Sequence, residues 1–233
     1  MASLLLTGVG IVSVYSASAI MAMDRHQDPY FFLRRQMIFA ALGIIAMLLA
    51  VQIDSRHLQR WAPLGLVFTL ILLGLVFIPG LAKEAGGAKR WLQVGRFSFQ
   101  PAELGKLTMV LYLAHRLAAL QPRRSRLVRK HLSLAGVIGV LVSCTFLQPD
   151  LGTAVLLVSI AVTVLFIGGV PLRYLVSALV VTLPFLYMAL VHVGFRWRRL
   201  LAFWDPWSVR LDAGFQIVQS LLAFGNGGLV GVG

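Results

Sequence analysis

Acidic side chains and cysteine are scarce in this sequence. Eight Asp and Glu residues stand against 21 Lys and Arg residues, and charged residues make up only 12% of the chain. Cys144 is the single cysteine, so an intrachain disulfide is excluded, and its place in an apolar run indicates a packing role. No spacing of His, Cys, Asp or Glu resembles a metal site, and no serine nucleophile elbow occurs. The glycine-rich end, GNGGLVGVG, lacks the lysine of a phosphate-binding loop.

Apolar residues are abundant instead. They make up 59% of the chain, and the mean hydropathy is +0.86, whereas soluble domains usually hold roughly 45–50% apolar residues. The composition therefore predicts an integral membrane protein. The formal net charge is +13, but the basic residues lie in short connectors between apolar runs. Anionic lipid headgroups or an anionic lipid-linked substrate are favoured as partners over nucleic acid.

The apolar runs predict an all-α, polytopic fold with about seven transmembrane helices. A span needs about 20 mostly apolar residues, and the run from Leu132 to Gly169 is long enough for two spans that turn at Gln148-Pro149-Asp150. The predicted spans are Ser3–Met23, Gln36–Ile53, Pro63–Pro79, Pro101–Ala119, the two halves of 132–169, and Leu172–Val193. The polar stretch at 54–61 is interpreted as a connector.

We interpret residues 1–193 as helices with short connectors and residues 194–233 as the start of a large extracytoplasmic loop. The total positive charge of the connectors does not decide the orientation, but six basic residues lie together between Arg116 and Lys130. This density favours the cytoplasmic side for that loop. Residues 86–100, the Gln148-Pro149-Asp150 turn and residues 194–233 are then expected on the outer face.

A polar segment after the third span is the first place to look for a functional site. Polar groups at the edge of the hydrocarbon are costly unless they are paired. Trp91 fits either an interfacial anchor or a stacking platform for a sugar, and the neighbouring cations could meet a pyrophosphate. The candidate binding residues here are Lys89, Arg90, Trp91, Gln93 and Arg96.

Two further groups of residues lie at predicted helix starts. Glu103 and Lys106 are three residues apart, so they share a helix face and can form an ion pair with a structural or a functional role. Asp150, next to Gln148, is placed to cap a helix, and a role as general base is the alternative.

The last 40 residues contain a third group of candidates. Gln148 and, in this group, Arg196, Asp205, Gln216 and Gln219 are predicted to bind substrate. Arg196, Arg198 and Arg199 form a basic cluster that is typical of headgroup contact. Asp205-Pro206 predicts a turn or a helix entry. Gln216, Gln219 and Ser220 follow helical spacing and would line one face of a helix.

Three separated segments closely resemble the SEDS family (shape, elongation, division, sporulation), which comprises the FtsW, RodA and SpoVE proteins. They are GAKRWLQVGRFSFQPAELGKL, QPDLGTAVLL and RRLLAFWDPWSVRLDAGFQIVQSLLAFGNGGLVGVG. VYSAS, DPYFFLRRQ and DPW resemble the division-type FtsW branch more than RodA. The resemblance covers essentially the whole chain.

The resemblance implies a peptidoglycan glycosyltransferase in the bacterial inner membrane at the division septum. It would polymerise lipid II, the undecaprenyl-pyrophosphate-linked disaccharide-pentapeptide, with a class B penicillin-binding protein and other division proteins as partners. Cationic side chains, or a divalent cation that arrives with the substrate, would stabilise the leaving pyrophosphate. Loss of function on substitution is expected at Trp91, Glu103, Lys106, Gln148, Asp150, Asp205 and Gln219.

The resemblance also implies that this sequence is an N-terminal portion. Family members have about ten spans, and their acid generally assigned as catalytic lies in an HTDF-type motif downstream of the glycine-rich segment in which Gly233 lies. We therefore expect the 233 residues to be inactive alone. Two alternatives remain open: a lipid II flippase, favoured by charged residues within the spans, and an inactive scaffold that binds division proteins.

Overall fold

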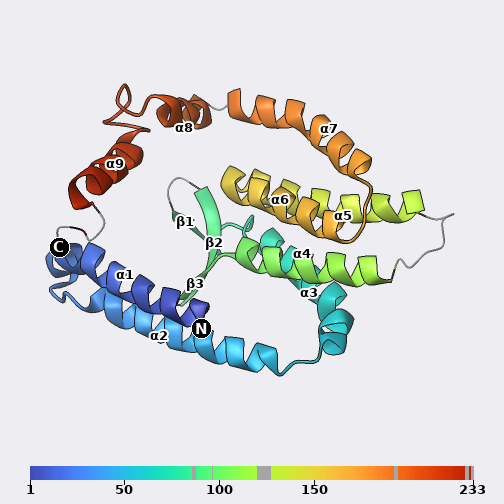
Figure 1. Cartoon of the computed structure of the whole chain (residues 1–233), viewed down its shortest axis with the longest axis horizontal. Helices are drawn as coiled ribbons and strands as arrows, with labels where there is room; N and C mark the ends of the chain where they lie inside the picture. The colour runs from blue at the N-terminus through green and yellow to red at the C-terminus, as the bar shows by residue number, and fades with distance from the viewer. Residues whose placement is uncertain (86–87, 96, 120–126, 192–193, 229–230, 232–233) are drawn as a thin grey trace. The chain divides into compact units, whose positions relative to one another are not determined.

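The computed structural model describes residues 1–85, 88–95, 97–119, 127–191, 194–228 and 231, and the chain divides into two compact units, 1–52 with 182–233, and 53–181 (Figure 1). The elements in chain order are α1 (Ala2–His26), α2 (Phe31–Val51), α3 (Ser55–Leu75), β1 (Ala82–Ala85), β2 (Ala88–Val94), β3 (Phe97–Phe99), α4 (Pro101–Ala118), α5 (Leu127–Leu147), α6 (Leu151–Ile167), α7 (Leu172–Val191), α8 (Gly194–Trp204) and α9 (Phe215–Gly227).

The predicted polytopic helical class is confirmed, since each of the seven predicted spans overlaps one of the helices α1 to α7 over most of its length. Within the described part of the chain, α1, α2 and α3 are long and apolar enough to cross a membrane. Shorter apolar helical stretches lie at 133–147, 151–167 and 172–184. The division into helices at 1–193 and a loop from residue 194 stays a prediction.

Helix α3 begins earlier than the sequence analysis predicts. The stretch at 54–61, interpreted there as a connector, forms the first turns of α3, so that interpretation is wrong. Asp54 is the N-cap, and its Oδ1 accepts a hydrogen bond from the amide of Arg56 at 3.0 Å. An Asp cap satisfies one of the free amides at a helix start, so the charged residues of this stretch continue the helix beyond its apolar part.

A small antiparallel sheet with strand order β1-β2-β3 occupies 82–99, where the sequence analysis expects only a polar connector. Gly95 between β2 and β3 has a φ of +62°, a left-handed conformation that suits glycine. The sheet precedes α4 directly and contacts it through β2 (Figure 1). Lys89, Arg90, Trp91 and Gln93 therefore lie on β2 of this sheet rather than on a loop.

Helices α3, α4, α5 and α6 pack together in the unit formed by 53–181. Its core consists of Leu66, Leu73, Ala102, Met109, Leu113, Leu134, Leu141, Leu157 and Ala161. Small residues let α3 and α4 approach closely: Thr69 and Thr108 join through their hydroxyls at 3.0 Å. A Cβ on Gly65 would lie 3.4 Å from the Thr108 methyl group. Such small-residue contacts are typical of helices that pack within membranes.

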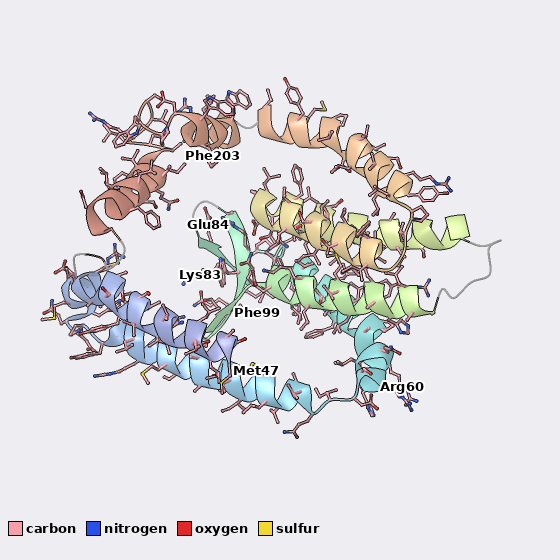
Figure 2. The ribbon with its side chains drawn as sticks, viewed as in Figure 1. Met47, Arg60, Lys83, Glu84, Phe99 and Phe203 are labelled. Atoms are coloured by element: carbon pink, nitrogen blue, oxygen red, sulfur yellow. The ribbon has the colours of Figure 1, made fainter. Side chains whose placement is uncertain are left out.

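Helices α1 and α2 contact each other but bury very little of their surface. Ala22 is the one buried residue of α1, and α2 has none within the part that the structure describes. Met47 of α2 is one of many exposed apolar side chains (Figure 2). Apolar side chains all around a long helix indicate lipid as the surrounding solvent. The protein is accordingly a membrane protein.

Candidate functional site

Asp150 lies at the junction of α5 and α6 and caps α6. Its Oδ1 accepts a hydrogen bond from the amide of Thr153 at 3.1 Å, which confirms the predicted capping role. Only 9% of the side chain is exposed. Burying a carboxylate costs free energy unless hydrogen bonds and a positive charge compensate it. The other partners of Asp150 therefore determine how much of this cost is offset.

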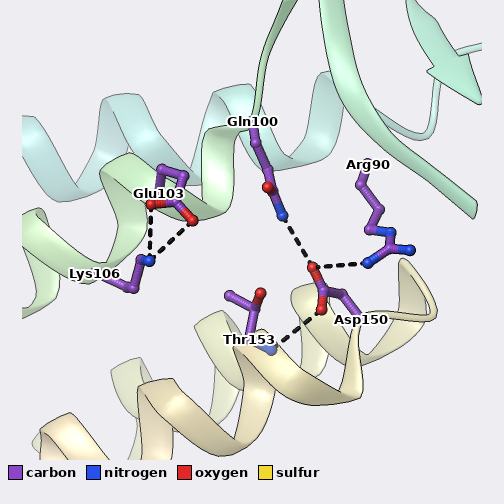
Figure 3. A network of polar contacts seen from close by, with 6 residues as sticks. All are labelled: Arg90, Gln100, Glu103, Lys106, Asp150 and Thr153. Carbon is purple, nitrogen blue, oxygen red and sulfur yellow. Dashed lines mark hydrogen bonds and ion pairs between the residues drawn. The ribbon is translucent and has the colours of Figure 1, made fainter. Parts of the chain in front are cut away.

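Those partners come from segments that are far away in the sequence. The amide Nε2 of Gln100, the N-cap of α4, donates to Asp150 Oδ2 at 2.9 Å. Arg90 Nη1 of β2 lies 3.5 Å from the same oxygen as an ion pair. Figure 3 shows both side chains converging on this carboxylate, with Thr153 on its other oxygen. We call Arg90, Gln100, Asp150 and Thr153 the Asp150 network.

A β-bulge explains how Arg90 reaches α6. Glu84 pairs with Lys89 and Lys83 pairs with Trp91, so Arg90 is an extra residue of β2 without a partner in β1. A bulge changes the direction of a side chain relative to the regular alternation of a strand. The Arg90 side chain is 29% exposed, and its buried Nε has no hydrogen-bond partner in the described structure. Asp150 thus engages only one nitrogen of this guanidinium.

The Asp150 network confirms one prediction about organisation. The cationic segment after α3 and the Gln148-Pro149-Asp150 turn were expected on the same side of the membrane, and they are in direct contact. Which side that is stays a prediction. Gln100 is not among the predicted site residues, although its position directly before Pro101 indicates a helix start.

Gln148 bonds to a different partner from those of the Asp150 network. Its Nε2 donates to the backbone carbonyl of Leu73 at 3.1 Å, and the side chain is buried. Leu73 lies in the last turn of α3, where carbonyls lack partners within the helix. Gln148 therefore links the end of α3 to the α5–α6 turn. A buried hydrogen bond of this kind indicates a structural role, while its predicted contact with substrate stays a prediction.

Glu103 and Lys106 form the expected pair on α4. Lys106 Nζ lies 2.9 Å from Oε1 and 2.8 Å from Oε2 of Glu103 (Figure 3). The Glu103 side chain is 55% exposed, and its position in the first turn suits the positive end of the helix dipole. The pair lies one turn after Gln100, so it borders the Asp150 network and still presents its carboxylate outward.

The other candidates on the hairpin have separate surroundings. Lys89 is exposed opposite Glu84, and Trp91 is half-buried opposite Lys83. Gln93 is exposed, and its Nε2 donates to the carbonyl of Gly95 at 3.1 Å. Figure 2 labels Lys83 and Glu84 on the neighbouring strand. Arg96 lies outside the described residues.

The candidates from 194–233 belong to the other compact unit. Asp205 accepts a hydrogen bond from the amide of Ser208 at 3.4 Å, as expected of a turn residue. Gln216 and Gln219 are exposed on α9, which confirms the predicted helix there. The Arg196 side chain lies outside the described part of the structure. The assignment of these four residues to substrate binding stays a prediction.

The described residues contain no group of three or more His, Cys, Asp or Glu side chains that could hold a metal ion. Asp150 already accepts three polar contacts, and Glu103 is bonded to Lys106 through both oxygens. The arrangement brings the guanidinium of Arg90 and the amide of Gln100 together at the starts of α4 and α6. Donors of this kind are suited to binding anions.

Comparison with known proteins gives the same family from three directions. A model of the FtsW/RodA/SpoVE family, described as cell cycle proteins, matches residues 1–233. The chain is 41% identical to the probable peptidoglycan glycosyltransferase FtsW of Geobacter metallireducens, over 98% of this chain and 61% of that protein. The chain spans less than two thirds of the length of such curated relatives.

Two solved structures are similar in fold and sequence. One is a chain of a peptidoglycan synthase complex studied for the coordination of polymerization and crosslinking. It has a TM-score of 0.67 and 30% identity, over 96% of this chain and 66% of that chain. The other is the rod shape determining protein RodA of Thermus thermophilus. Its TM-score is 0.59 at 29% identity, over 77% of this chain and 57% of that chain.

Proposed function

The chain belongs to the FtsW/RodA/SpoVE family of cell cycle proteins, and from that premise we propose that it is part of a peptidoglycan glycosyltransferase. The substrate would be lipid II, and the product a glycan strand for the septal wall. The observation that carries this proposal is the similarity to FtsW proteins along almost the whole chain. The structure adds to that similarity the Arg90 guanidinium, of which Asp150 engages one nitrogen, at the ends of α4 and α6, with the exposed Lys89 next to it on β2.

The proposed reaction is a glycosyl transfer. The 4-hydroxyl of one glycan attacks the anomeric carbon of another, a new C–O bond forms there, and the bond to undecaprenyl pyrophosphate breaks. A base takes the hydroxyl proton, and the leaving pyrophosphate carries the negative charge. Fixed positive groups next to that charge stabilise the transition state more than the ground state.

On this proposal Arg90 and Lys89 lie near the pyrophosphate and stabilise its negative charge. A divalent cation bound to the substrate would stabilise the same charge. Asp150 holds Arg90 in place. Both Asp150 oxygens already accept polar contacts, which favours this positioning role over proton abstraction. Trp91 would support a sugar ring, and the accessible carboxylate of Glu103 would border the acceptor.

The proposed setting is the bacterial cytoplasmic membrane at the division septum, with a class B penicillin-binding protein as partner. The similarity to a chain of a peptidoglycan synthase complex supports such a partner. Residues 86–100 would then face the periplasmic side, where a lipid-linked precursor is consumed.

The test uses the full-length protein purified with its penicillin-binding partner and supplied with labelled lipid II. We expect glycan strands from the wild type and a much lower yield from Asp150→Asn. The matched control is Asp54→Asn, since Asp54 also caps a helix but is exposed and distant from the network in sequence. Absence of polymer from an intact, folded complex would remove the proposal.

A lipid II flippase is the second candidate, and the charged pair Glu103–Lys106 within α4 favours it. The two functions are separated by reconstituting the protein into vesicles that contain no other glycan polymerase and measuring both the translocation of lipid II and the formation of glycan strands. Translocation of lipid II without strand formation would favour the flippase. Strand formation without translocation would favour the glycosyltransferase.

A further inference from the structure

Helix α8 and the turn that follows it have a defined shape of their own. Arg198 Nη1 of α8 lies 3.6 Å from Asp212 Oδ2, which ties the end of the turn back to the helix. Gly214 closes the turn so tightly that a Cβ there would lie 2.5 Å from the carbonyl oxygen of Pro206. We call residues 194–214 the α8 segment.

The outer surface of the α8 segment is strongly apolar. Trp197, Leu201 and Trp204 recur at the spacing i, i+4 and i+7, so they share one face of α8. All three are exposed, and Trp204 reaches 88%. Among the side chains of α8 that the structure describes, the small Ala202 is the one that is buried. Large apolar side chains face outward and a small one faces inward, the reverse of a helix that packs into a protein core.

Other large apolar side chains of the segment are exposed as well. They are Phe203 near the end of α8, which Figure 2 labels, and Trp207 beyond that end. Leu211 in the turn is 88% exposed. A patch of large exposed apolar side chains marks a contact surface rather than an ordinary protein surface.

Charge and length identify the kind of contact. The segment carries arginines at positions 196, 198, 199 and 210 against Asp205 and Asp212, and it also contains five of the protein's Trp and Phe residues. A helix of 11 residues is about 16 Å long, too short for a hydrocarbon core of about 30 Å. A short, basic helix with Trp on its apolar face is typical of a helix that lies in the headgroup region.

The position in the chain supports the same contact. Helix α7 ends at Val191, and α8 begins at Gly194. Because α7 covers a predicted membrane span, the α8 segment starts where the chain leaves the hydrocarbon. Its apolar face therefore lies close along the chain to a helix that is surrounded by lipid.

We propose that the α8 segment is a membrane-surface anchor that binds anionic phospholipid, with its Trp197, Leu201 and Trp204 face inserted among the headgroups. The anchor lies along the bilayer surface and does not cross it. Its arginines meet lipid phosphates, and its aromatic rings occupy the boundary between headgroups and acyl chains. This inference does not depend on the proposed glycosyl transfer.

The test places a fluorophore on the segment in the complete chain. Trp204→Cys in a Cys144→Ser background is labelled with an environment-sensitive dye, and the protein is reconstituted into nanodiscs of phosphatidylglycerol or phosphatidylcholine with brominated acyl chains. We expect blue-shifted emission that is quenched by the brominated lipid, with stronger quenching in phosphatidylglycerol at low salt than at high salt. Lys83→Cys, exposed on β1, is the control and should be quenched much less.

A second labelling site tests whether the result at position 204 is a local effect of replacing Trp204. Leu211→Cys is as exposed as Trp204 and should give the same result. Red-shifted, unquenched emission at both sites would overturn the proposal. Shielding that appears only when a penicillin-binding protein is added would also overturn it, because the surface would then be a protein interface. Equal quenching in both lipids at all salt concentrations would contradict the preference for anionic lipid.

Discussion

Asp150 and Glu103 are both acidic residues at the start of a membrane helix, and both pair with a basic side chain. Asp150 is almost fully buried, and its partners come from β2, from the N-cap of α4 and from α6 itself. Glu103 is exposed and pairs with Lys106 one turn further along the same helix. The first arrangement fixes how three segments meet. The second is local and leaves its carboxylate accessible.

The comparison predicts that Asp150→Ala has the largest effect on stability. It removes a helix cap and leaves the Arg90 guanidinium partly buried without its charge partner. Breaking one side of a buried pair costs about 3–5 kcal/mol, and the partial exposure of Arg90 places the expected loss near the lower value. The free energy of unfolding in a detergent titration measures it. Asp54→Ala, an exposed cap, should cost clearly less, and equal losses for the two variants would break the comparison.

Arg90→Ala should rank second. Asp150 keeps its hydrogen bonds from Gln100 and Thr153, so the expected loss is about 2 kcal/mol, the range for a hydrogen bond to a charged group. The neighbouring Lys89→Ala is the matched control, because Lys89 is exposed. Its unfolding free energy should change by less than about 0.5 kcal/mol. A larger loss for Lys89→Ala than for Arg90→Ala would contradict the bulge geometry.

Gln148→Ala should cost about 1–2 kcal/mol, because it leaves the Leu73 carbonyl without its donor in a buried position. The same detergent titration checks this value. Gln93→Ala is the control, since that side chain is exposed and bonds only within its own turn. If both variants unfold like the wild type, Gln148 does not link α3 to the α5–α6 turn.

Glu103→Gln should have the smallest effect on stability. Exposed pairs within one helix contribute about 0.3–0.5 kcal/mol, and glutamine retains a hydrogen-bond acceptor for Lys106. The unfolding transition should therefore stay nearly unchanged. A loss of lipid II polymerisation without a loss of stability would then assign Glu103 to the chemistry. An unfolding loss as large as that of Asp150→Ala would show that the two acids are equivalent.

The helices could be predicted from the sequence because lipid requires long apolar segments with their backbone hydrogen bonds satisfied internally. Helix α3 shows the limit of this reasoning. Its first turns carry charged residues, so run length alone places its start too late, although Asp54 followed by Ser55 carried the signal of a helix cap.

The hairpin at 82–99 could not be predicted from alternation. The extra residue Arg90 shifts the register of β2 against β1, and a bulge of this kind interrupts the period of two that identifies a strand. Arg90 could therefore be named as a candidate, but the direction of its side chain could not be derived.

The Asp150 network could be predicted only in part. The cap on α6 is local, since Asp150 and Thr153 are three residues apart, and the sequence predicts it. The contact with Gln100 joins residues 50 positions apart. No spacing rule predicts such a contact, because it depends on how α4 and α6 pack.

A double-mutant cycle on Arg90 and Asp150 tests the central claim most directly. The free energy of unfolding is measured for the wild type, Arg90→Ala, Asp150→Ala and the variant with both changes. If β2 and α6 are joined through this ion pair, the double variant should lose about 1–3 kcal/mol less than the two single losses added together. Losses that add to within about 0.5 kcal/mol would show that the two side chains act independently and would contradict the account.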